Sequence, residues 1–344
     1  MTTPSRHHDS LFLRAARGED TATAPVWFMR QAGRHLPEYL ALKERWSFWE
    51  MVRTPEIACD VTLQPVRRYG MDAAIFFSDI MTPLPAMGVD IEFSPGPVIQ
   101  TPIRTRAQVD ALRVPDAAEI APFGTDAIRL ITQESPVPLI GFGGAPLTLA
   151  AYLVQGSGSK DFAAFRAFLR AEPNAAHLLI DKLTELSIRY LDSQIEAGAS
   201  AVQIFDSWAG LHDRWIWERY AMPSLERLLS ALARHNVPRI YFALDAAHLM
   251  EQLRVLPAEV YGWDWRMPLN EVRNRLGARA VQGNLDPAAL LADPQALRSE
   301  VERVLRAGQG GAHVFNLGHG IFRETDPANV QRALETIRAF DRHS

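Results

Sequence analysis

Eight short apolar runs, spread along the whole chain, limit the folds that this sequence can adopt. Each run is almost continuously apolar, a pattern typical of parallel strands that are covered on both faces. Segments with helical spacing separate them, among them 54–69, 173–198 and 326–340. The runs are APVWFMR (24–30), DAAIFFSD (72–79), VPLIGFGG (137–144), AVQIFDS (201–207), RIYFALD (239–245), VYGWDW (260–265), ARAVQGNL (278–285) and GAHVFNLG (311–318).

This alternation predicts an α/β fold of the (β/α)8 TIM-barrel type. A doubly wound open sheet is the alternative that the pattern leaves open. No interdomain linker interrupts the 344 residues. We therefore expect one barrel domain over residues 21–344, preceded by an N-terminal extension, residues 1–20, that is poorly ordered or peripheral. The stretch 88–105 has two alternating runs around Ser-Pro-Gly-Pro and predicts an added hairpin.

The carboxyl ends of the runs carry polar or glycine residues. In a barrel these ends meet at one mouth, which is where active sites lie. Strand ends also carry Asp, Asn and Gly simply because they meet water, so the pattern indicates a site without establishing one. The residues are Arg30, Ser78-Asp79, Gly143-Gly144, Asp206-Ser207, Asp245, Asp264, Gly283-Asn284 and Gly318-His319.

The charge balance and the single cysteine exclude several classes of protein. A net charge of −4 argues against a general binder of nucleic acid or of membrane surfaces, so an anion site must be a local group of arginines. Cys59 alone cannot supply an internal disulfide, a CxxC redox pair or a multi-cysteine zinc site. Because no stretch of 18 apolar residues and no apolar leader is found, we expect a soluble, cytoplasmic protein.

Two arginines at the end of the first run indicate an anion site. Arg30 and Arg34 flank the small residues Ala32 and Gly33, and Gln31 lies between them. Backbone N–H groups can approach a ligand there, and each guanidinium can bind a carboxylate through two hydrogen bonds. Two exposed arginines at a strand end would explain the pattern equally well.

Three further residues are candidates for a site at the same mouth. Asp79 ends the second run, where it either caps the next turn or faces a cationic or N–H-rich substrate. Tyr152 falls in a helical segment after Gly143-Gly144, where core packing is the simpler interpretation. His319 lies between two glycines and therefore lacks an apolar face to pack on.

Several common site types are not supported. Pro146 stands where the third glycine of G-x-G-x-x-G belongs, and GSGSK lacks the spacing of a phosphate-binding P-loop. Neither His212-Asp213 nor His7-His8 has a recognised metal-ligand spacing, so we expect no metal. The chain lacks G-x-S-x-G, which leaves a hydrolase triad unsupported.

Six segments together resemble the uroporphyrinogen decarboxylase family. They are PVWFMRQAGRHLPEY, TLQPVRRYGMDAAIFFSDI, GFGGAPLTLAAYLVQGSGSKDF, FDSWAG, VQGNLDP and NLGHGI, in this order and over about residues 20–340. The resemblance implies a (β/α)8 barrel that forms a homodimer and needs no cofactor. It also implies the conversion of the four acetates of uroporphyrinogen III, an octacarboxylate, to methyls, which gives coproporphyrinogen III and CO2.

The resemblance also assigns roles to residues. Asp79 matches the central catalytic aspartate, and Arg30 and Tyr152 are the other catalytic candidates. The implied substrate contacts are Arg30, Gln31, Ala32, Gly33, Arg34, Lys43, Asp79, Tyr152, Phe205, Ser207 and His319. Two positions depart from the family: Lys43 replaces an arginine and loses its two-pronged hydrogen bonding, and His35 stands where tyrosine is common.

The implied chemistry separates the roles of Asp79 and the arginines. Protonation of the pyrrole ring makes a cationic electron sink, and a fixed carboxylate that accepts the pyrrole N–H bonds stabilises that state. A tight grip on the reacting carboxylate would instead stabilise the ground state, so we expect the arginines to hold the other carboxylates. The proton donor stays open among Arg30, Tyr152, His319 and water, although arginine is a poor general acid.

Two other functions remain as alternatives. A related barrel methyltransferase would use zinc held by His and Cys, which a chain with Cys59 alone does not supply. A non-catalytic tetrapyrrole-binding protein would need the arginines but not Asp79.

Overall fold

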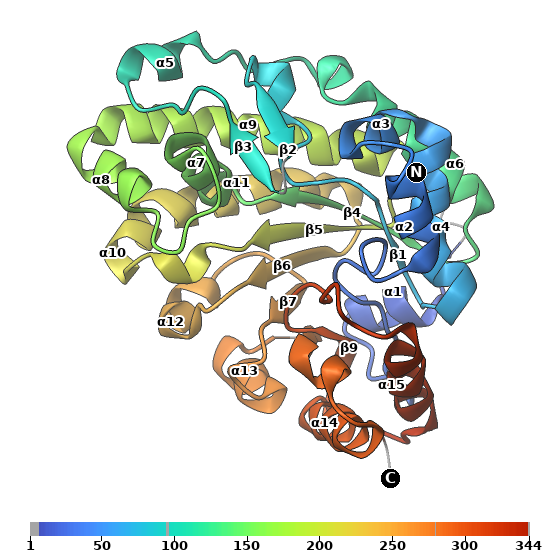
Figure 1. Ribbon diagram of the computed structural model, residues 1–344. Coiled ribbons are helices and arrows are strands. Elements are labelled where there is room, and N and C mark those ends of the chain that lie inside the picture. The colour runs from blue at the N-terminus through green and yellow to red at the C-terminus, as the bar shows by residue number, and fades with distance from the viewer. Residues whose placement is uncertain (1–6, 94–95, 279, 343–344) are drawn as a thin grey trace.

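A parallel sheet forms the centre of the computed structural model, which describes residues 7–93, 96–278 and 280–342 (Figure 1). The strands pair in the order β1-β4-β5-β6-β7-β8-β9, which is their order along the chain. The strands are β1 (Ala74–Ile75), β4 (Leu139–Gly144), β5 (Ala201–Asp206), β6 (Arg239–Ala243), β7 (Val260–Trp263), β8 (Ala280–Leu285) and β9 (Ala312–Leu317).

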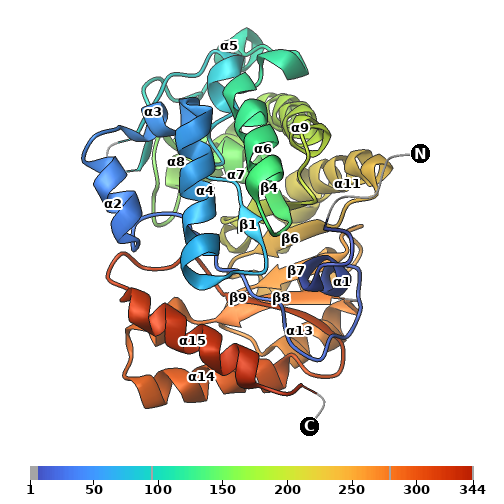
Figure 2. The same ribbon diagram turned by 90° about the vertical axis from the view of Figure 1, so that its right-hand side faces the viewer.

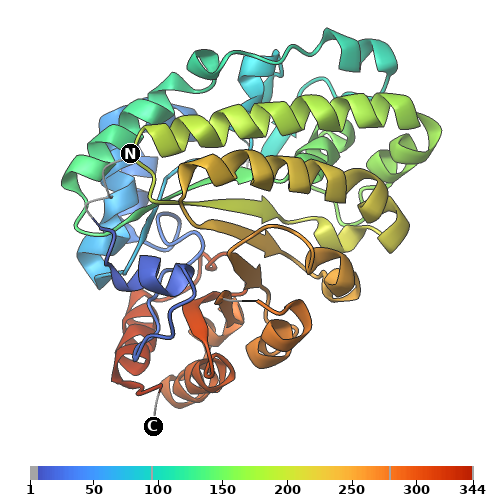
Figure 3. The ribbon, with the colours of Figure 1, turned by 180° about the vertical axis from the view of Figure 1, so that it is seen from behind.

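Helices surround this sheet on its outer side. Figure 3 shows α9 and α11 side by side in front of the strands in the view from behind, and Figure 2 shows α4 beside α6 and α14 beside α15. The described α-helices are α1 (Leu11–Ala16), α2 (Pro37–Lys43), α3 (Phe48–Arg53), α4 (Pro55–Tyr69), α5 (Arg106–Ala111), α6 (Pro122–Glu134), α7 (Pro146–Gln155), α8 (Ala163–Ala171), α9 (Pro173–Glu196), α10 (Arg214–Ile216), α11 (Met222–Leu232), α12 (Met250–Leu253), α13 (Leu269–Leu276), α14 (Pro294–Ala307) and α15 (Pro327–Ala339). Short 3-10 turns lie between them, and a π-helical turn, η4 (Trp217–Ala221), joins α10 to α11.

The local signals in the sequence account for these elements. Every residue of β4, β8 and β9 is buried, which explains why their runs are apolar without alternation. The helices predicted over 54–69, 173–198 and 326–340 are confirmed as α4, α9 and α15. At the start of α15 the Asp326 carboxylate accepts a hydrogen bond from the Ala328 N–H, and Pro327 occupies the first helical position.

The first apolar run closes the barrel without forming a regular strand. Val26 makes a parallel bridge to Phe315 of β9. On its other side, the Val26 carbonyl accepts a hydrogen bond from the Asp72 N–H at 2.9 Å, and the Val26 N–H donates to Asp72 Oδ2 at 2.8 Å. The segment therefore joins β9 to the chain that enters β1, so the two edges of the sheet meet.

This closure decides between the two folds that the sequence left open. The sheet is a closed (β/α)8-type barrel in a single domain, not a doubly wound open sheet. The prediction of eight regular strands is wrong at the first run. Pro25 has no N–H to donate, and the chain turns at Arg30, where φ is +62°, so regular pairing cannot extend along 24–30.

A short polar chain crosses the inside of the barrel. Trp27 Nε1 donates to Gln282 Oε1 at 3.1 Å, and Gln282 Nε2 donates to Gln203 Oε1 at 2.9 Å. All three residues are fully buried, so the bonds also hold the closing segment to β8 and β5.

The predicted hairpin in 88–105 is confirmed. It consists of β2 (Ile91–Phe93) and β3 (Pro97–Ile99), which pair antiparallel with Ile91 opposite Ile99. Residues 94–95 of its turn lie outside the described residues. The Ile99 N–H donates to the Gly156 carbonyl at 2.7 Å, which attaches the hairpin to the end of α7.

The predicted N-terminal extension is packed where the structure describes it. Residues 1–6 lie outside the described residues, but α1 buries Phe12, Leu13, Ala15 and Ala16 in the core next to β9. Within residues 7–20 the extension is therefore not peripheral, because four of the six residues of α1 supply apolar packing. Among the described residues, no helix combines the length and the hydrophobicity that a bilayer crossing requires.

Candidate active site

The turn that carries the two arginines is held in place by buried side-chain amides. The Phe28 N–H donates to Gln31 Oε1 at 2.9 Å, and Gln31 Nε2 donates to the Ala73 carbonyl at 3.0 Å. The Met29 N–H donates to Asn316 Oδ1 at 2.9 Å. Both ends of the Gln31 side chain are thus used within the protein, which leaves only its backbone for the substrate contact predicted from the sequence.

The side chains of Arg30 and Arg34, both on this turn, differ in their exposure to solvent. Arg30 is exposed and Arg34 is half-buried. Gly33, with φ of +148°, allows the chain to reverse between them. Loss of hydration and the charges of Arg30 and Arg323 lower the pKa of Arg34, while Tyr39 and Glu324 act in the opposite direction. Ala32 is half-buried within the same turn.

The loop after β9 packs directly against the Arg30 side chain. A Cβ atom on Gly320 would lie 2.4 Å from Arg30 Cδ, so only glycine leaves room for that side chain. The Ile321 N–H donates to the Met29 carbonyl at 3.0 Å. The ends of the first run and of β9 are therefore neighbours, as expected at the mouth of a barrel.

Asp79 uses one carboxylate oxygen for the protein and keeps the other available. Its Oδ1 accepts a hydrogen bond from the Met81 N–H at 2.9 Å, and the Thr82 hydroxyl accepts one from the Asp79 N–H at 3.2 Å. No described residue donates a hydrogen bond to Oδ2 or forms an ion pair with this carboxylate. Both interpretations of the sequence therefore apply, since Asp79 caps its own turn and still presents a free acceptor.

Loss of hydration raises the pKa of Asp79, against the Met81 N–H bond and the positive charge of Arg30, which lower it. A carboxylate that has lost hydration binds N–H donors or cations more strongly than one in water. The Arg30 charge also shows that the two residues lie within electrostatic reach of each other.

Tyr152 lies on α7 and faces the same group. Burial raises the pKa of its hydroxyl, the negative charge of Asp79 adds to this effect, and the Arg30 charge opposes it. Its ring packs edge-on against Phe162 and Trp208, with centroids 5.9 and 6.0 Å apart. The structure thus brings Arg30, Asp79 and Tyr152 together from three separate segments.

A row of aromatic rings connects β4 with the loop after β9. Phe142 contacts Phe205 with centroids 5.5 Å apart, Phe205 contacts Phe242 at 5.9 Å, and Phe242 contacts His319 at 6.4 Å. Phe205, predicted to contact substrate, is half-buried in this row. Aromatic faces beside arginines suit a ligand with an apolar ring body and charged edges.

His319 is neutral near pH 7. Loss of hydration, followed by the charges of Arg30, Arg34 and Arg266, lowers its pKa to about 4. Its Nδ1 accepts a hydrogen bond from the Gly320 N–H at 2.6 Å. The neutral ring therefore carries its hydrogen on Nε2, which makes His319 a hydrogen-bond donor rather than an imidazolium acid.

Arg266 and Arg323 are two cations at this mouth that the sequence analysis did not single out. Arg266 follows β7 and its Nη1 donates to Asp264 Oδ2 at 2.8 Å, so its charge is compensated. The sequence carried a signal for both, because Arg266 stands three residues beyond the end of β7 and Arg323 six residues beyond the end of β9.

The other residues singled out in the sequence are less closely connected with the group of Arg30, Asp79 and Tyr152. Ser207 follows β5 and is half-buried. Lys43 is the exposed last residue of α2, and no described contact joins it to the other predicted residues. His35 is buried, its Nε2 lies 3.4 Å from the Tyr69 hydroxyl, and burial lowers its pKa to about 4.

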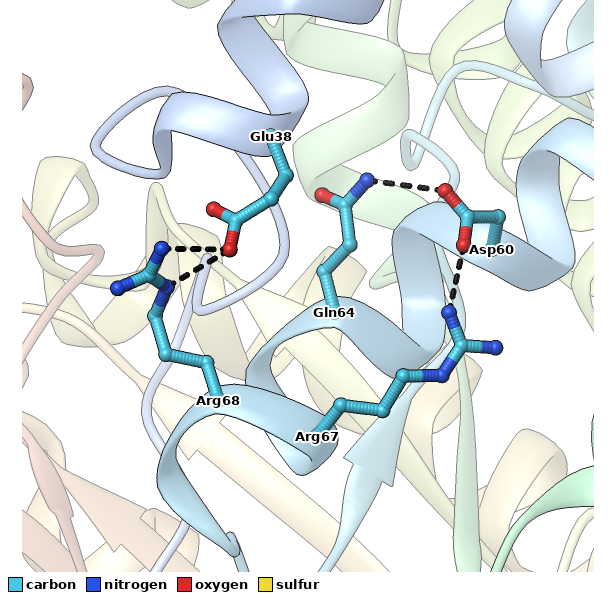
Figure 4. A pocket seen from close by; sticks show the side chains of 5 residues that line it. All are labelled: Glu38, Asp60, Gln64, Arg67 and Arg68. Atoms are coloured by element: carbon cyan, nitrogen blue, oxygen red, sulfur yellow. Dashed lines mark hydrogen bonds and ion pairs between the residues drawn. The ribbon is translucent and has the colours of Figure 1, made fainter.

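An exposed hollow between α2 and α4 offers charged side chains but not an anion site (Figure 4). Arg68 donates twice to Glu38, at 2.9 and 2.6 Å, and Arg67 donates to Asp60 at 2.6 Å. Gln64 donates to the second oxygen of Asp60. The arginines here are neutralised by carboxylates, unlike Arg30 and Arg34.

Within residues 7–93, 96–278 and 280–342, no three His, Cys, Asp or Glu side chains gather as metal ligands would.

Known proteins similar to this chain point to one family. A sequence model described as uroporphyrinogen decarboxylase (URO-D) matches residues 7–340. The uroporphyrinogen decarboxylase of Geobacillus thermodenitrificans (strain NG80-2) is 48% identical over 340 residues, which cover 98% of this chain and 99% of that protein. The enzyme of the same name from Citrifermentans bemidjiense is 45% identical over 335 residues, covering 96% and 98%.

Solved structures of lower identity share the fold. A methyltransferase from Methanosarcina mazei superposes with a TM-score of 0.79 at 20% identity, covering 95% of this chain and 96% of that one. A B12-independent methionine synthase from Shewanella sp. W3-18-1 gives a TM-score of 0.58 at 9% identity, covering 94% and 96%. At these identities the likeness supports the barrel and carries no information on activity.

Proposed function

The chain belongs to the uroporphyrinogen decarboxylase family, and on this premise we propose that Asp79, at its barrel mouth, is the catalytic centre for decarboxylation of uroporphyrinogen. Members of this family are carboxy-lyases, and this chain is one of them. The reaction removes CO2 from each of the four acetate side chains and leaves a methyl group. One proton is consumed for each CO2 released.

The free Oδ2 of Asp79 is the observation that carries this assignment. Protonation of a pyrrole carbon creates a cation whose charge is shared with the ring N–H group. A partly dehydrated carboxylate with one unused oxygen accepts that N–H bond best when the ring is charged, which lowers the barrier rather than only tightening binding. CO2 then leaves and its bonding electrons enter the ring. The methylene carbon takes up a proton to become the methyl, and the ring carbon releases the proton that it gained, so the net uptake is one proton.

Arg30 and Arg34 hold carboxylates that do not react in that round. Neither guanidinium has a described ion pair. Arg30 lies close enough to Asp79 for its charge to lower the pKa of that carboxyl, and Arg34 lies within electrostatic reach of Arg30. A firm bond to the reacting carboxylate would oppose catalysis, because that negative charge disappears as CO2 forms. The backbone of Gln31, Ala32 and Gly33, together with Ser207 and Phe205, completes the contacts in this proposal.

The protonation states of His319 and Tyr152 narrow the choice of proton donor. His319 is neutral because its pKa is about 4, so we assign its Nε2–H a hydrogen bond to a substrate carboxylate. The raised pKa of Tyr152 makes its hydroxyl a weak acid that orients substrate. We assign proton delivery to water at the arginine-lined side of the site.

Anaerobic incubation with uroporphyrinogen III, followed by chromatography of the oxidised products, tests the function. We expect porphyrins with seven, six, five and four carboxyls to appear in turn. Their absence would refute decarboxylation and leave the methyltransferase and carrier alternatives.

The Asp79→Asn variant tests the assigned centre. Asn retains an oxygen for the Met81 N–H but loses the charge, so we expect kcat to fall about 100-fold or more while substrate still binds. Asp60→Asn, which removes one negative charge in the hollow on α4, is the matched control and should retain the wild-type rate. A wild-type kcat for Asp79→Asn would assign catalysis elsewhere.

We further propose that the enzyme works in the cytoplasm as a homodimer. Large apolar side chains that stay exposed on the single chain support a partner surface: Leu40, Trp46 and Trp215 are exposed by more than a third. Sedimentation equilibrium tests this proposal, because a species of 38.4 kDa at micromolar concentration would exclude the dimer.

A further inference from the structure

The loop after β9 brings a third arginine to the turn of Arg30 and Arg34. Gly320 packs against the Arg30 side chain, and the Ile321 N–H is bonded to the Met29 carbonyl. Arg323 follows two residues later and is exposed. It lies close enough to Arg34 for its charge to disfavour the Arg34 guanidinium.

The three arginines form a group whose side chains make no direct ion pair with the residues that the structure describes. In the described part of the chain, Arg30, Arg34 and Arg323 take part in no ion pair with a carboxylate and donate no hydrogen bond to another residue. Glu324 is the acidic neighbour that offsets the repulsion at Arg34. Arg266, on the same mouth, contrasts with them because Asp264 neutralises it. Guanidinium groups that repel one another without a protein partner are arranged for an anionic ligand.

We propose that Arg323 is a third substrate-binding cation, which makes the enzyme favour porphyrinogens that carry more carboxylates. This inference rests on the proposed function and extends its site to the loop after β9. The substrate begins with eight carboxylates and loses one in each round. A partly exposed cation acts through charge attraction, so its contribution is largest for the octacarboxylate and smallest for the pentacarboxylate.

Steady-state kinetics of Arg323→Gln, measured with the octacarboxylate and with the pentacarboxylate as substrates, test this inference. At low ionic strength we expect KM for the octacarboxylate to rise about three- to fivefold, with a smaller rise for the pentacarboxylate and little change in kcat. Added salt should shrink the difference from wild type, since exposed charges are screened. Glu324→Gln, which removes the offsetting charge, should shift KM for the octacarboxylate in the opposite direction.

Two variants serve as controls. Arg332→Gln makes the same change in net charge on α15, where the Arg332 side chain donates to Asn329, and it should leave both KM values unchanged. Arg323→Lys keeps the charge and should restore most of the wild-type KM for the octacarboxylate.

The outcomes separate this inference from the function itself. If wild-type protein yields no decarboxylated product, the proposed function fails. If wild type is active but Arg323→Gln and Arg332→Gln have the same KM for both substrates, the role of Arg323 is refuted. An equal rise in KM for both substrates would refute the preference for highly carboxylated porphyrinogens.

Discussion

At the scale of single residues, the site depends on which atoms the fold leaves unused. Asp79 gives one oxygen to the Met81 N–H and keeps the other, whereas Gln31 gives both ends of its amide to the backbone. Their residue types are equally suited to substrate binding. Only Asp79 retains a free side-chain atom to use for it.

Gly320 offers a test of the Arg30 position. In Gly320→Ala the new Cβ would clash with Arg30 Cδ, and the guanidinium must move while the rest of the loop stays in place. We expect KM to rise about three- to tenfold, because charge-assisted bonds to substrate carboxylates are lost or lengthened. Gly158→Ala, whose Cβ would meet nothing within 4 Å, is the control. Unchanged KM in Gly320→Ala would show that Arg30 does not bind substrate.

At the scale of elements, the closing segment is held mainly by side chains. The segment bridges β9 at Val26 and reaches the chain before β1 through Asp72 and Gln31. A regular strand would be held by a ladder of backbone bonds along its length. Here a few side-chain bonds replace that ladder, so single substitutions can loosen the turn that carries Arg30.

Gln31→Ala tests this dependence. It leaves the buried Phe28 N–H without an acceptor, so we expect the free energy of unfolding to fall by about 1–3 kcal/mol in urea denaturation. KM should rise with it, because Arg30 is the adjacent residue. Gln331→Ala, on the exposed side of α15, should change stability by less than about 0.5 kcal/mol. A higher KM without any loss of stability would instead restore Gln31 as a direct substrate contact.

At the scale of the whole molecule, buried neutral histidines make stability depend on pH. Burial lowers the pKa of His35, His212 and His319 to about 4, and that of His313 to about 3, from the usual 6.5. At a pH between these lowered pKa values and 6.5, the unfolded chain binds more protons than the folded one. The contribution of the four neutral histidines to the free energy of unfolding is therefore complete above pH 6.5 and is lost as the pH falls toward 4. The raised pKa values of Asp72, Asp79 and Asp206 act with the opposite sign near their own range and offset part of the loss.

The His212→Phe variant measures how much His212 contributes to the loss of stability at low pH. The ring already packs edge-on against Phe165, and its Nε2 has no hydrogen-bond partner, so phenylalanine fits the same surroundings. We expect the variant to lose less stability than wild type between pH 7 and pH 5, by at most about 2 kcal/mol, in urea unfolding at each pH. An identical loss in both proteins would contradict the buried neutral state of His212.

Local patterns of residues were enough to predict the elements and the side of the barrel on which the site lies. Continuous apolar runs mark strands covered on both faces, and helical spacing with caps marks α4, α9 and α15, because these signals act within a few neighbouring residues. The polar strand ends and the pair Arg30 and Arg34 indicated an anion site for the same local reason.

The tertiary structure alone decided how the barrel closes and which groups serve the site. The loss of a regular first strand, the use of Gln31 within the protein, the approach of Arg323 to Arg34 and the neutral state of His319 all depend on residues distant in sequence. Hydrogen-bond partners, burial and charge repulsion are properties of groups that the fold brings together, and no local pattern of residues records them.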